Sequence, residues 1–268
     1  MITGAADPAS DTPCPGPAAP RPPGWWYAYR DAIPDWFTPY LRLEAVAHRL
    51  REHADLLVPG LLQTPEYAYA VFQTRLATSD DDRDRLTEVR LHRQRLLRRH
   101  LPPPPRLDVI LSEAVLLRVV GGRATMAGQL RRLCEASELP YVTIRVVPLA
   151  AGAHHGAVAG AFTLLDFPPD NEPPDPSGVP SPDNEPPNPS AVPSVDDGPT
   201  AVRPADEGSN AGPSSLVYRE FLTGALYLDD VTEVDAYQRI WTSLDTLALD
   251  EHQSRHLIDT IRREVHHG

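Results

Sequence analysis

The chain of 268 residues contains no lysine, and all 25 of its basic residues are arginine. This excludes the phosphate-binding lysine of P-loop proteins, Schiff-base lysines and Ser–Lys catalytic dyads. Only two cysteines are present, Cys14 and Cys134, and neither has a CxxC partner. That pattern disfavours a zinc ribbon or a thioredoxin-type site. Such sparse cysteine fits a reducing compartment, so we expect a cytoplasmic protein without disulfides.

Long apolar runs and catalytic motifs are also missing. No apolar run approaches 18 residues, and the start lacks a basic stretch followed by an apolar core. We therefore expect neither a membrane span nor a secretory signal. The sequence has no GxSxG, no GxGxxG before a helix and no nucleophile–base motif. Our expectation is a protein that is not an enzyme and carries no cofactor.

The ten histidines offer little support for a metal site. His252 and His256 have the i, i+4 spacing of helical metal ligands, but Gln253 stands where a zinc-protease HExxH motif has glutamate. A third ligand is not evident, so a solvated helix face is the favoured interpretation and no metal is predicted. His154 and His155, which glycines flank in a loop after a strand, are better placed for function.

Charge is distributed unevenly along the chain. The formal net charge is −12, and most of it comes from segment 168–214, which holds nine acidic residues and one arginine. An acidic chain is a poor general ligand of nucleic acid, because affinity for a duplex comes mostly from neutralised phosphates. One alternative stays open, since the predicted helix 82–99 carries seven arginines and could bind DNA or an acidic partner. Acid–arginine alternation at its start also suits pairing within the helix.

Composition divides the chain into one domain and two other segments. Residues 1–24 and 168–214 are rich in Pro, Gly, Ser and Asp, so we predict a disordered leader and a disordered acidic insertion. The insertion contains a 13-residue direct repeat, 169–181 and 182–194, whose copies differ at two positions. Residues 25–167 and 215–268 form the single predicted domain, with the insertion as an overgrown hairpin loop.

Apolar spacing predicts an α+β fold with a helix-rich N-terminal half, a small mixed β-sheet packed against helices on one side, and two C-terminal helices. Residues 152–160 are predicted as a loop, and 113–120 stays open between helix and strand. Glu44 and Glu113 are candidates for buried carboxylates. The predicted helices are 36–53, one from Pro65 to about Leu76 with Thr64 as N-cap, 82–99, 124–137, 230–247 and one that Asp250 caps; the predicted strands are 107–111, 141–147, 161–167 and 216–219.

A set of motifs in fixed order points to a known family. The string from Val58 to Ala68, VPGLLQTPEYA, resembles the signature of a C-terminal domain of unknown function found in actinobacterial Xre-type antitoxin-like transcriptional regulators. Further matches are Leu43-Glu44-x-x-Ala47, Arg90-Leu91-His92-Arg93-Gln94, Leu111-x-Glu113-Ala114-x-Leu116, Val120-Gly121-Gly122, Met126-x-x-Gln129-Leu130, Val146-Val147-Pro148, Gly152-Ala153-His154-x-Gly156, Phe162, Val217-Tyr218-x-Glu220 and Ala248-Leu249.

The resemblance implies a non-enzymatic regulatory module that binds a protein partner, either a toxin-like protein or a paralogous regulator. A helix-turn-helix normally precedes this domain in the family, whereas 24 residues precede Trp25 here. Direct binding of nucleic acid is therefore disfavoured, and a homo-oligomer stays open. The positions expected near a shared pocket or partner surface are His154, Glu113, Gln63, Tyr67 and Gln94. A small-molecule sensor or weak hydrolase with a pocket near His154 and Glu113 is the alternative.

Overall fold

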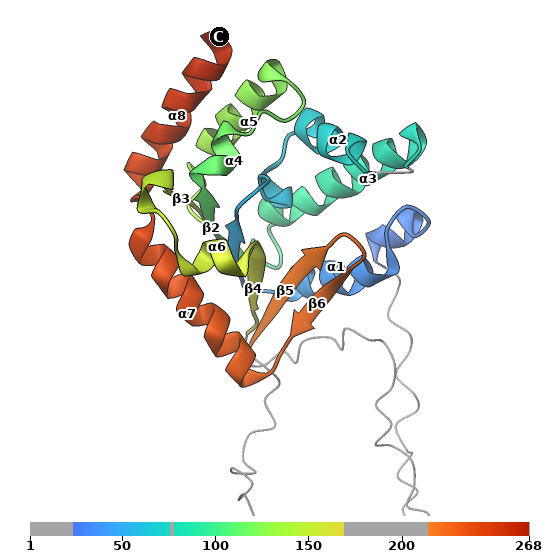
Figure 1. The fold of residues 1–268 in the computed structure, drawn as a ribbon. Coiled ribbons are helices and arrows are strands. Elements are labelled where there is room, and N and C mark those ends of the chain that lie inside the picture. Colours follow the sequence, from blue (N-terminus) through green and yellow to red (C-terminus); the bar gives the residue numbers. More distant parts are fainter. Residues whose placement is uncertain (1–23, 76–77, 169–213, 268) are drawn as a thin grey trace, which may run out of the picture.

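The computed structural model of the chain describes residues 24–75, 78–168 and 214–267. It confirms the predicted α+β class, with a mixed sheet, helices packed against it and two C-terminal helices (Figure 1). The leader 1–24 and the insertion 168–214 lie almost entirely outside the described residues, so both stay predictions. The helices are α1 (Thr38–Val46), α2 (Pro65–Gln73), α3 (Asp80–Arg93), α4 (Glu113–Leu117), α5 (Arg123–Ala136), α6 (His155–Ala159), α7 (Val231–Leu247) and α8 (Glu251–His267).

The six strands form one sheet in the order β3-β2-β1-β4-β5-β6. Strands β1 to β3 are parallel, and β4, β5 and β6 continue the sheet antiparallel to their neighbours. The connections between the parallel strands contain helices, as parallel pairing requires. The bounds are β1 (Arg49–Ala54), β2 (Arg106–Ser112), β3 (Val142–Val147), β4 (Phe162–Asp166), β5 (Ser215–Phe221) and β6 (Gly224–Leu228).

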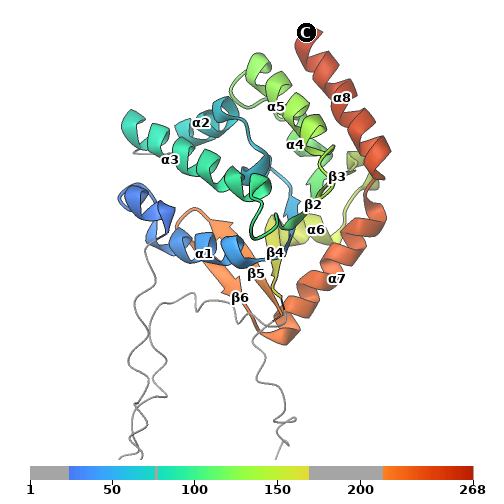
Figure 2. The same cartoon turned by 180° about the vertical axis from the view of Figure 1, so that it is seen from behind.

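Helices cover both faces of the sheet, so the predicted one-sided arrangement is wrong. On one face, Leu107 and Val109 of β2 pack in a core with α2, α5 and α8. On the other, Ile110 of the same strand packs with Trp241 and Leu244 of α7. Figures 1 and 2 show α7 and α8 following one another along one side of the molecule. Because both faces of β2 are buried, its sequence is a nearly continuous apolar run.

The predicted helix 36–53 is wrong beyond residue 46. Helix α1 ends at Val46, and Arg49–Ala54 form the central strand β1. Charged side chains are stable in this strand because acids on its neighbours pair with them. The Arg49 guanidinium lies 2.7 Å from Asp108 on β2, and that of Arg51 lies 2.7 Å from Asp166 on β4. Helical periodicity within one segment does not reveal these pairs, because they join residues far apart in the sequence.

At several other helix and strand boundaries, nearby residues were enough to predict the element. Thr64 caps α2 by accepting a hydrogen bond from the Tyr67 amide, and Asp230 caps α7 in the same way. Strands β3 and β5 lie where they were predicted, and β5 pairs with β4. The ambiguous segment after β2 is the short helix α4, and the Arg-rich helix ends at Arg93, with a 3-10 turn through Arg98. The predicted loop 152–160 contains α6, and β6 had no prediction.

Gly156 sets the close approach of α6 to α7. A Cβ atom there would lie 2.5 Å from Cδ2 of Leu244, whereas a Cβ at Gly128 on α5 meets nothing within 4 Å. We expect Gly156→Ala to lower the free energy of unfolding by about 1–3 kcal/mol, because the fully buried Leu244 must move. Gly128→Ala should raise it by up to about 1 kcal/mol through helix propensity. Urea unfolding measures both, and equal effects of the two variants would contradict this packing.

Candidate functional site

Three of the five expected site residues meet at one buried loop, Val58–Thr64, in the most distinctive motif of the sequence. The Gln63 side-chain amide donates to the Val58 carbonyl at 2.7 Å, and the Tyr67 hydroxyl accepts from the Val58 amide at 3.2 Å. Gln94 donates to the backbone carbonyl of Gln63 at 2.7 Å. The three side chains thus hold the loop in a single conformation.

A third glutamine completes this network. Gln129 of α5 is fully buried; its amide donates to the Leu62 carbonyl at 2.9 Å, and its carbonyl accepts from the Thr64 amide at 2.7 Å. Buried backbone groups outside regular structure need such partners. The motif therefore forms a rigid loop. Most of its polar groups make hydrogen bonds that hold this loop.

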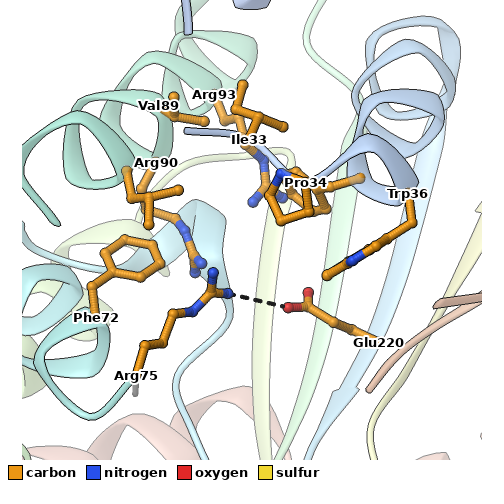
Figure 3. A pocket seen from close by; sticks show the side chains of 11 residues that line it. Ile33, Pro34, Trp36, Phe72, Arg75, Val89, Arg90, Arg93 and Glu220 are labelled. Atoms are coloured by element: carbon orange, nitrogen blue, oxygen red, sulfur yellow. Dashed lines mark ion pairs between the residues drawn. The ribbon is translucent and has the colours of Figure 1, made fainter. Parts of the chain in front are cut away.

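The rigid loop stands beside a pocket that we call the arginine pocket (Figure 3). It lies between α2 and α3 on one side and the segment before α1 on the other, and β5 contributes Glu220. The space inside it is small, about 20 Å³, and only the hollow as a whole, with its opening to solvent, reaches about 360 Å³. The side chains that line it are Ile33, Pro34, Trp36, Phe37, Phe72, Arg75, Leu86, Val89, Arg90, Arg93 and Glu220.

Arg93 is the arginine of the pocket that forms a buried ion pair. Its guanidinium makes two hydrogen bonds to the Glu44 carboxylate, at 2.6 and 3.0 Å, and both side chains are almost fully buried. It also lies over the rings of Phe37 and Tyr40. The Glu44 carboxylate raises the pKa of Arg93 against the opposing effect of burial. The burial predicted for Glu44 is confirmed, and the pair ties α1 to α3.

Arg90 has no such partner. Within the described residues, its guanidinium makes one hydrogen bond, 3.1 Å to the side-chain oxygen of Gln63, and no ion pair. It also lies 5.1 Å from the centre of the Phe72 ring. Burial, followed by the positive charge of Arg93, lowers the pKa of Arg90 to about 10. The carboxylates of Glu220 and Glu52 oppose this shift in part.

Arg75 adds a second cation beside Arg90. Its guanidinium also lies 5.1 Å from the Phe72 ring centre, and one nitrogen is 3.6 Å from the Glu220 carboxylate. Figure 3 shows the guanidinium groups of Arg75 and Arg90 converging on the same space, with Phe72 on one side and Trp36 on the other. Converging cations with few anionic partners are typical of a site for a negatively charged group.

Glu52 of β1 faces the same cluster from the sheet. Burial raises its pKa to about 7, an effect that the positive charges of Arg93 and Arg90 oppose and the negative charges of Glu44 and Glu220 enhance. Because Glu52 lies on the β1 face that carries the main core, its charge is poorly solvated.

The other two expected residues lie elsewhere. His154 caps α6, its Nδ1 accepting from the Ala157 amide at 3.3 Å, and its ring centre is 6.4 Å from that of His53. Glu113 accepts a hydrogen bond from the Leu149 amide at 2.7 Å. Neither side chain joins the glutamine network around Val58–Thr64. Whether any of the five residues binds a ligand stays a prediction.

His53 is the buried member of the histidine pair. Its Nδ1 lies 3.1 Å from the Ile110 carbonyl oxygen, and its Nε2 makes no hydrogen bond within the described residues. Burial lowers the pKa of His53 below its ordinary value of 6.5. The folded state thus binds this proton less readily than the unfolded state.

We expect His53 to destabilise the protein as the pH falls. Its contribution is complete above pH 6.5 and is lost as the pH drops from 6.5 through its lowered folded-state pKa. Glu52, with its raised pKa, has the opposite sign between pH 4.5 and 7, so the measurement must be differential. Urea unfolding from pH 5 to 7.5 should show a weaker loss at low pH for His53→Leu than for wild type. The exposed His155→Ala serves as control, and parallel curves for all three proteins would contradict the assignment.

The arginines of α3 have mostly internal partners. Arg83 pairs with Asp80 and Arg85 with Asp31. Arg93 and Arg90 point into the protein. A helix whose guanidinium groups are used in this way offers few of them to a phosphate backbone. DNA binding by the Arg-rich segment 82–99 stays an alternative prediction.

Sequence reasoning missed Arg75, Arg90, Arg93, Glu52 and Glu220 as members of one site. A signal was present for two of them. Leu86, Val89 and Arg93 recur at helical spacing and form the buried face of α3, and Arg90 lies four residues after Leu86. Polar residues on the apolar face of a helix are candidates for buried function. No comparable signal marks Glu52, because its strand was not recognised.

The described residues contain neither a metal-binding cluster nor a membrane-spanning helix. Across 24–75, 78–168 and 214–267, no cluster of three or more His, Cys, Asp or Glu side chains is arranged to hold a metal ion, and His252 and His256 are exposed on α8. In that same part of the chain, no helix has both the length and the apolar composition needed to cross a bilayer.

Comparison with known proteins identifies a family. A family model described as a domain of unknown function, DUF5753, matches residues 37–177 and 197–260, which is more than half of the chain. The break between the two matched ranges falls inside the predicted insertion 168–214. No curated protein and no solved structure matches the chain significantly. The chain therefore belongs to the DUF5753 family, whose domain has no assigned function.

Proposed function

We propose that this chain is a non-enzymatic regulatory module that senses a small anionic molecule in the arginine pocket. The observation that carries the proposal is the guanidinium of Arg90, which makes no ion pair within the described residues and which a glutamine oxygen holds in the partly apolar pocket that Arg75 also lines. Ligand pockets combine apolar walls with a few fixed polar groups, as this one does. The proposal keeps the sensor expected from the sequence but moves its site away from His154 and Glu113.

The context of the module follows the family resemblance. We propose that it serves an antitoxin-like transcriptional regulator in the cytoplasm, where ligand occupancy would alter its association with a partner. The pocket joins the segment before α1, the α2–α3 pair and β5, so a bound ligand would contact elements from both ends of the domain. A ligand can shift a conformational equilibrium only through such differential contacts.

Calorimetric titration of the full chain with sodium benzoate and with inorganic phosphate tests the proposal. At least one anion should bind, and Arg90→Met should weaken its binding about tenfold or more, because a charge-assisted hydrogen bond is lost. Arg85→Met is the matched control, since it removes an arginine from the same helix outside the pocket. Failure of both anions to bind, or equal losses in both variants, would overturn the proposal.

A second candidate function, binding of a protein partner, is supported by the free edge of the sheet. Strand β6 forms that edge, whereas the Leu249 amide donates to Val146 of β3 at the opposite edge. Beside β6, Phe221, Leu222 and Leu226 are 45%, 95% and 45% exposed. A strand edge with exposed apolar side chains suits pairing with a partner strand.

Copurification with the protein encoded beside this gene and with paralogous regulators tests the second candidate. Leu222→Ser combined with Leu226→Ser should reduce recovery of the partner. Val158→Ser, an apolar residue 90% exposed on α6, should leave it unchanged. Equal recovery with all three proteins, or no recovery of either partner by the wild-type chain, would count against this candidate.

A further inference from the structure

We infer that the chain has a second ligand site, separate from the arginine pocket, which binds a small organic monocation with an apolar body. The site is an open basin beside α2, and its space of about 490 Å³ lies within the range of ligand pockets. The linings of the two sites share no described residue, so this inference does not rest on the anion sensor proposed above.

One face of α2 forms the main wall of the basin. Apart from Pro65, the α2 residues of the lining recur at intervals of three and four positions, which places their side chains on one face of the helix. They are Glu66, Tyr69, Ala70 and Gln73. Phe72 and Arg75, which line the arginine pocket, lie on a different side of this segment. Figures 1 and 2 show α2 between α3 and α5, and these two helices add Thr87 and Thr125 to the basin.

Gly121 lets the turn before α5 pack directly against α2. Its φ of +68° lies in the left-handed region, and a Cβ atom there would lie 2.8 Å from Cβ of Ala70 and 2.9 Å from Cγ2 of Thr125. All three residues line the basin, so its two walls meet at this contact. Backbone packing therefore sets the shape of the basin at this point, rather than the position of long, movable side chains.

The fold leaves four polar side chains of the basin unused. Within the described residues, no hydrogen bond or ion pair is formed by the side chains of Glu66, Tyr69, Gln73 and Thr125. The Thr87 hydroxyl, by contrast, donates to the Arg83 carbonyl at 2.8 Å. Carboxylate, phenol, amide and hydroxyl groups that share one basin and lack protein partners can orient a ligand through hydrogen bonds.

The charge of the basin argues for a cation. Among the described residues, Glu66 is the one charged member of the lining. An acid in the first turn of a helix also complements the macrodipole, so Glu66 alone would not mark a site. Tyr69, however, lies one turn further along the same face, and the faces of aromatic rings attract cations. A carboxylate and a phenol ring in one basin favour an ammonium group, whereas Glu66 would repel an anion.

The rest of the lining argues for a compact apolar body with a single charge. Pro65, Ala70 and the ring of Tyr69 offer apolar contact area. One carboxylate balances one positive charge, so a polycation would keep an excess of charge in the basin. Because Glu66 is exposed, solvent screens its interaction, and the dissociation constant should be modest, on the order of 1 mM. A small aromatic amine meets these conditions.

Amide NMR titration of the full chain at neutral pH with benzylammonium, its uncharged analogue benzyl alcohol and benzoate tests the inference. Benzylammonium should bind about three- to fivefold more tightly than benzyl alcohol and should shift amides of α2 and of the turn before α5. Benzoate should leave these amides unshifted. Glu66→Gln should remove the preference for the cation, and Tyr69→Leu should weaken benzylammonium binding about two- to fivefold.

Glu251→Gln is the matched control, since it removes an exposed acid from the first turn of α8, outside the basin. It should leave the titration unchanged. Equal affinity for benzylammonium and benzyl alcohol would overturn the cation class. Equal losses in Glu66→Gln and Glu251→Gln, shifts confined to residues outside the basin, or no binding of benzylammonium would overturn the site. The anion sensor has its own readout, because it depends on Arg90 and not on Glu66.

Discussion

Replacing Arg93 with methionine should lower the free energy of unfolding by about 3–5 kcal/mol, the cost expected when one partner of a buried ion pair is removed. The change leaves the Glu44 carboxylate, which is 3% exposed, without the two hydrogen bonds that compensate its burial. It also removes the cation from the rings of Phe37 and Tyr40. The methionine fills much of the same volume, so the loss reports mainly on charge.

Urea unfolding of Glu44→Leu, of the double variant and of Arg85→Met makes this result specific. The double variant Glu44→Leu with Arg93→Met should recover most of the stability, because an apolar pair often replaces a buried ion pair without loss. Arg85→Met, whose pair with Asp31 is largely exposed, should cost less than about 1 kcal/mol. Additive losses in the double variant, or a loss below about 1 kcal/mol for Arg93→Met, would contradict the buried pair.

Gln129→Leu should lower the free energy of unfolding by about 2–5 kcal/mol. Its side chain is fully buried and satisfies two backbone groups, the Leu62 carbonyl and the Thr64 amide. Leucine has a similar volume but leaves both groups without partners, and each such group costs about 1–3 kcal/mol. The Val58–Thr64 loop, whose regular structure is one short 3-10 turn at Gly60–Leu62, should loosen first.

Gln73→Leu is the matched control for this prediction. Gln73 is an exposed residue near the end of α2, so its replacement should change stability by less than about 0.5 kcal/mol. Amide hydrogen exchange at Leu62 to Thr64 should accelerate in Gln129→Leu and stay unchanged in Gln73→Leu. Equal stability of the two variants would show that the buried glutamine does not hold the loop.

The fold could be predicted from the sequence where local chemistry decides it. Thr64 followed by Pro65 marks the start of α2, and Asp230 marks that of α7, because caps act within a few residues. The run before Pro148 predicts β3 through its β-branched residues. Burial of Glu44 also followed from its place beside the apolar face of its helix.

The rest depends on partners that are distant in sequence. Strand β1 was not predicted, because its arginines are stable in a strand only beside Asp108 and Asp166. The arginine pocket was not predicted for the same reason, since Arg90 contacts Gln63 and Arg75 contacts Glu220 only in the folded chain. The family motif contains Gln63, Tyr67 and Gln94, whose side chains hold the loop beside Arg90, and a role for them at a pocket or partner surface stays a prediction.

The central claim is that Arg90 holds an anion in the arginine pocket, and a crystal structure of the chain with saturating benzoate tests it most directly. The account predicts a benzoate carboxylate within hydrogen-bond distance of the Arg90 guanidinium, at the pocket that Arg90 lines. An empty pocket at saturation, or benzoate bound only away from Arg90, would contradict it.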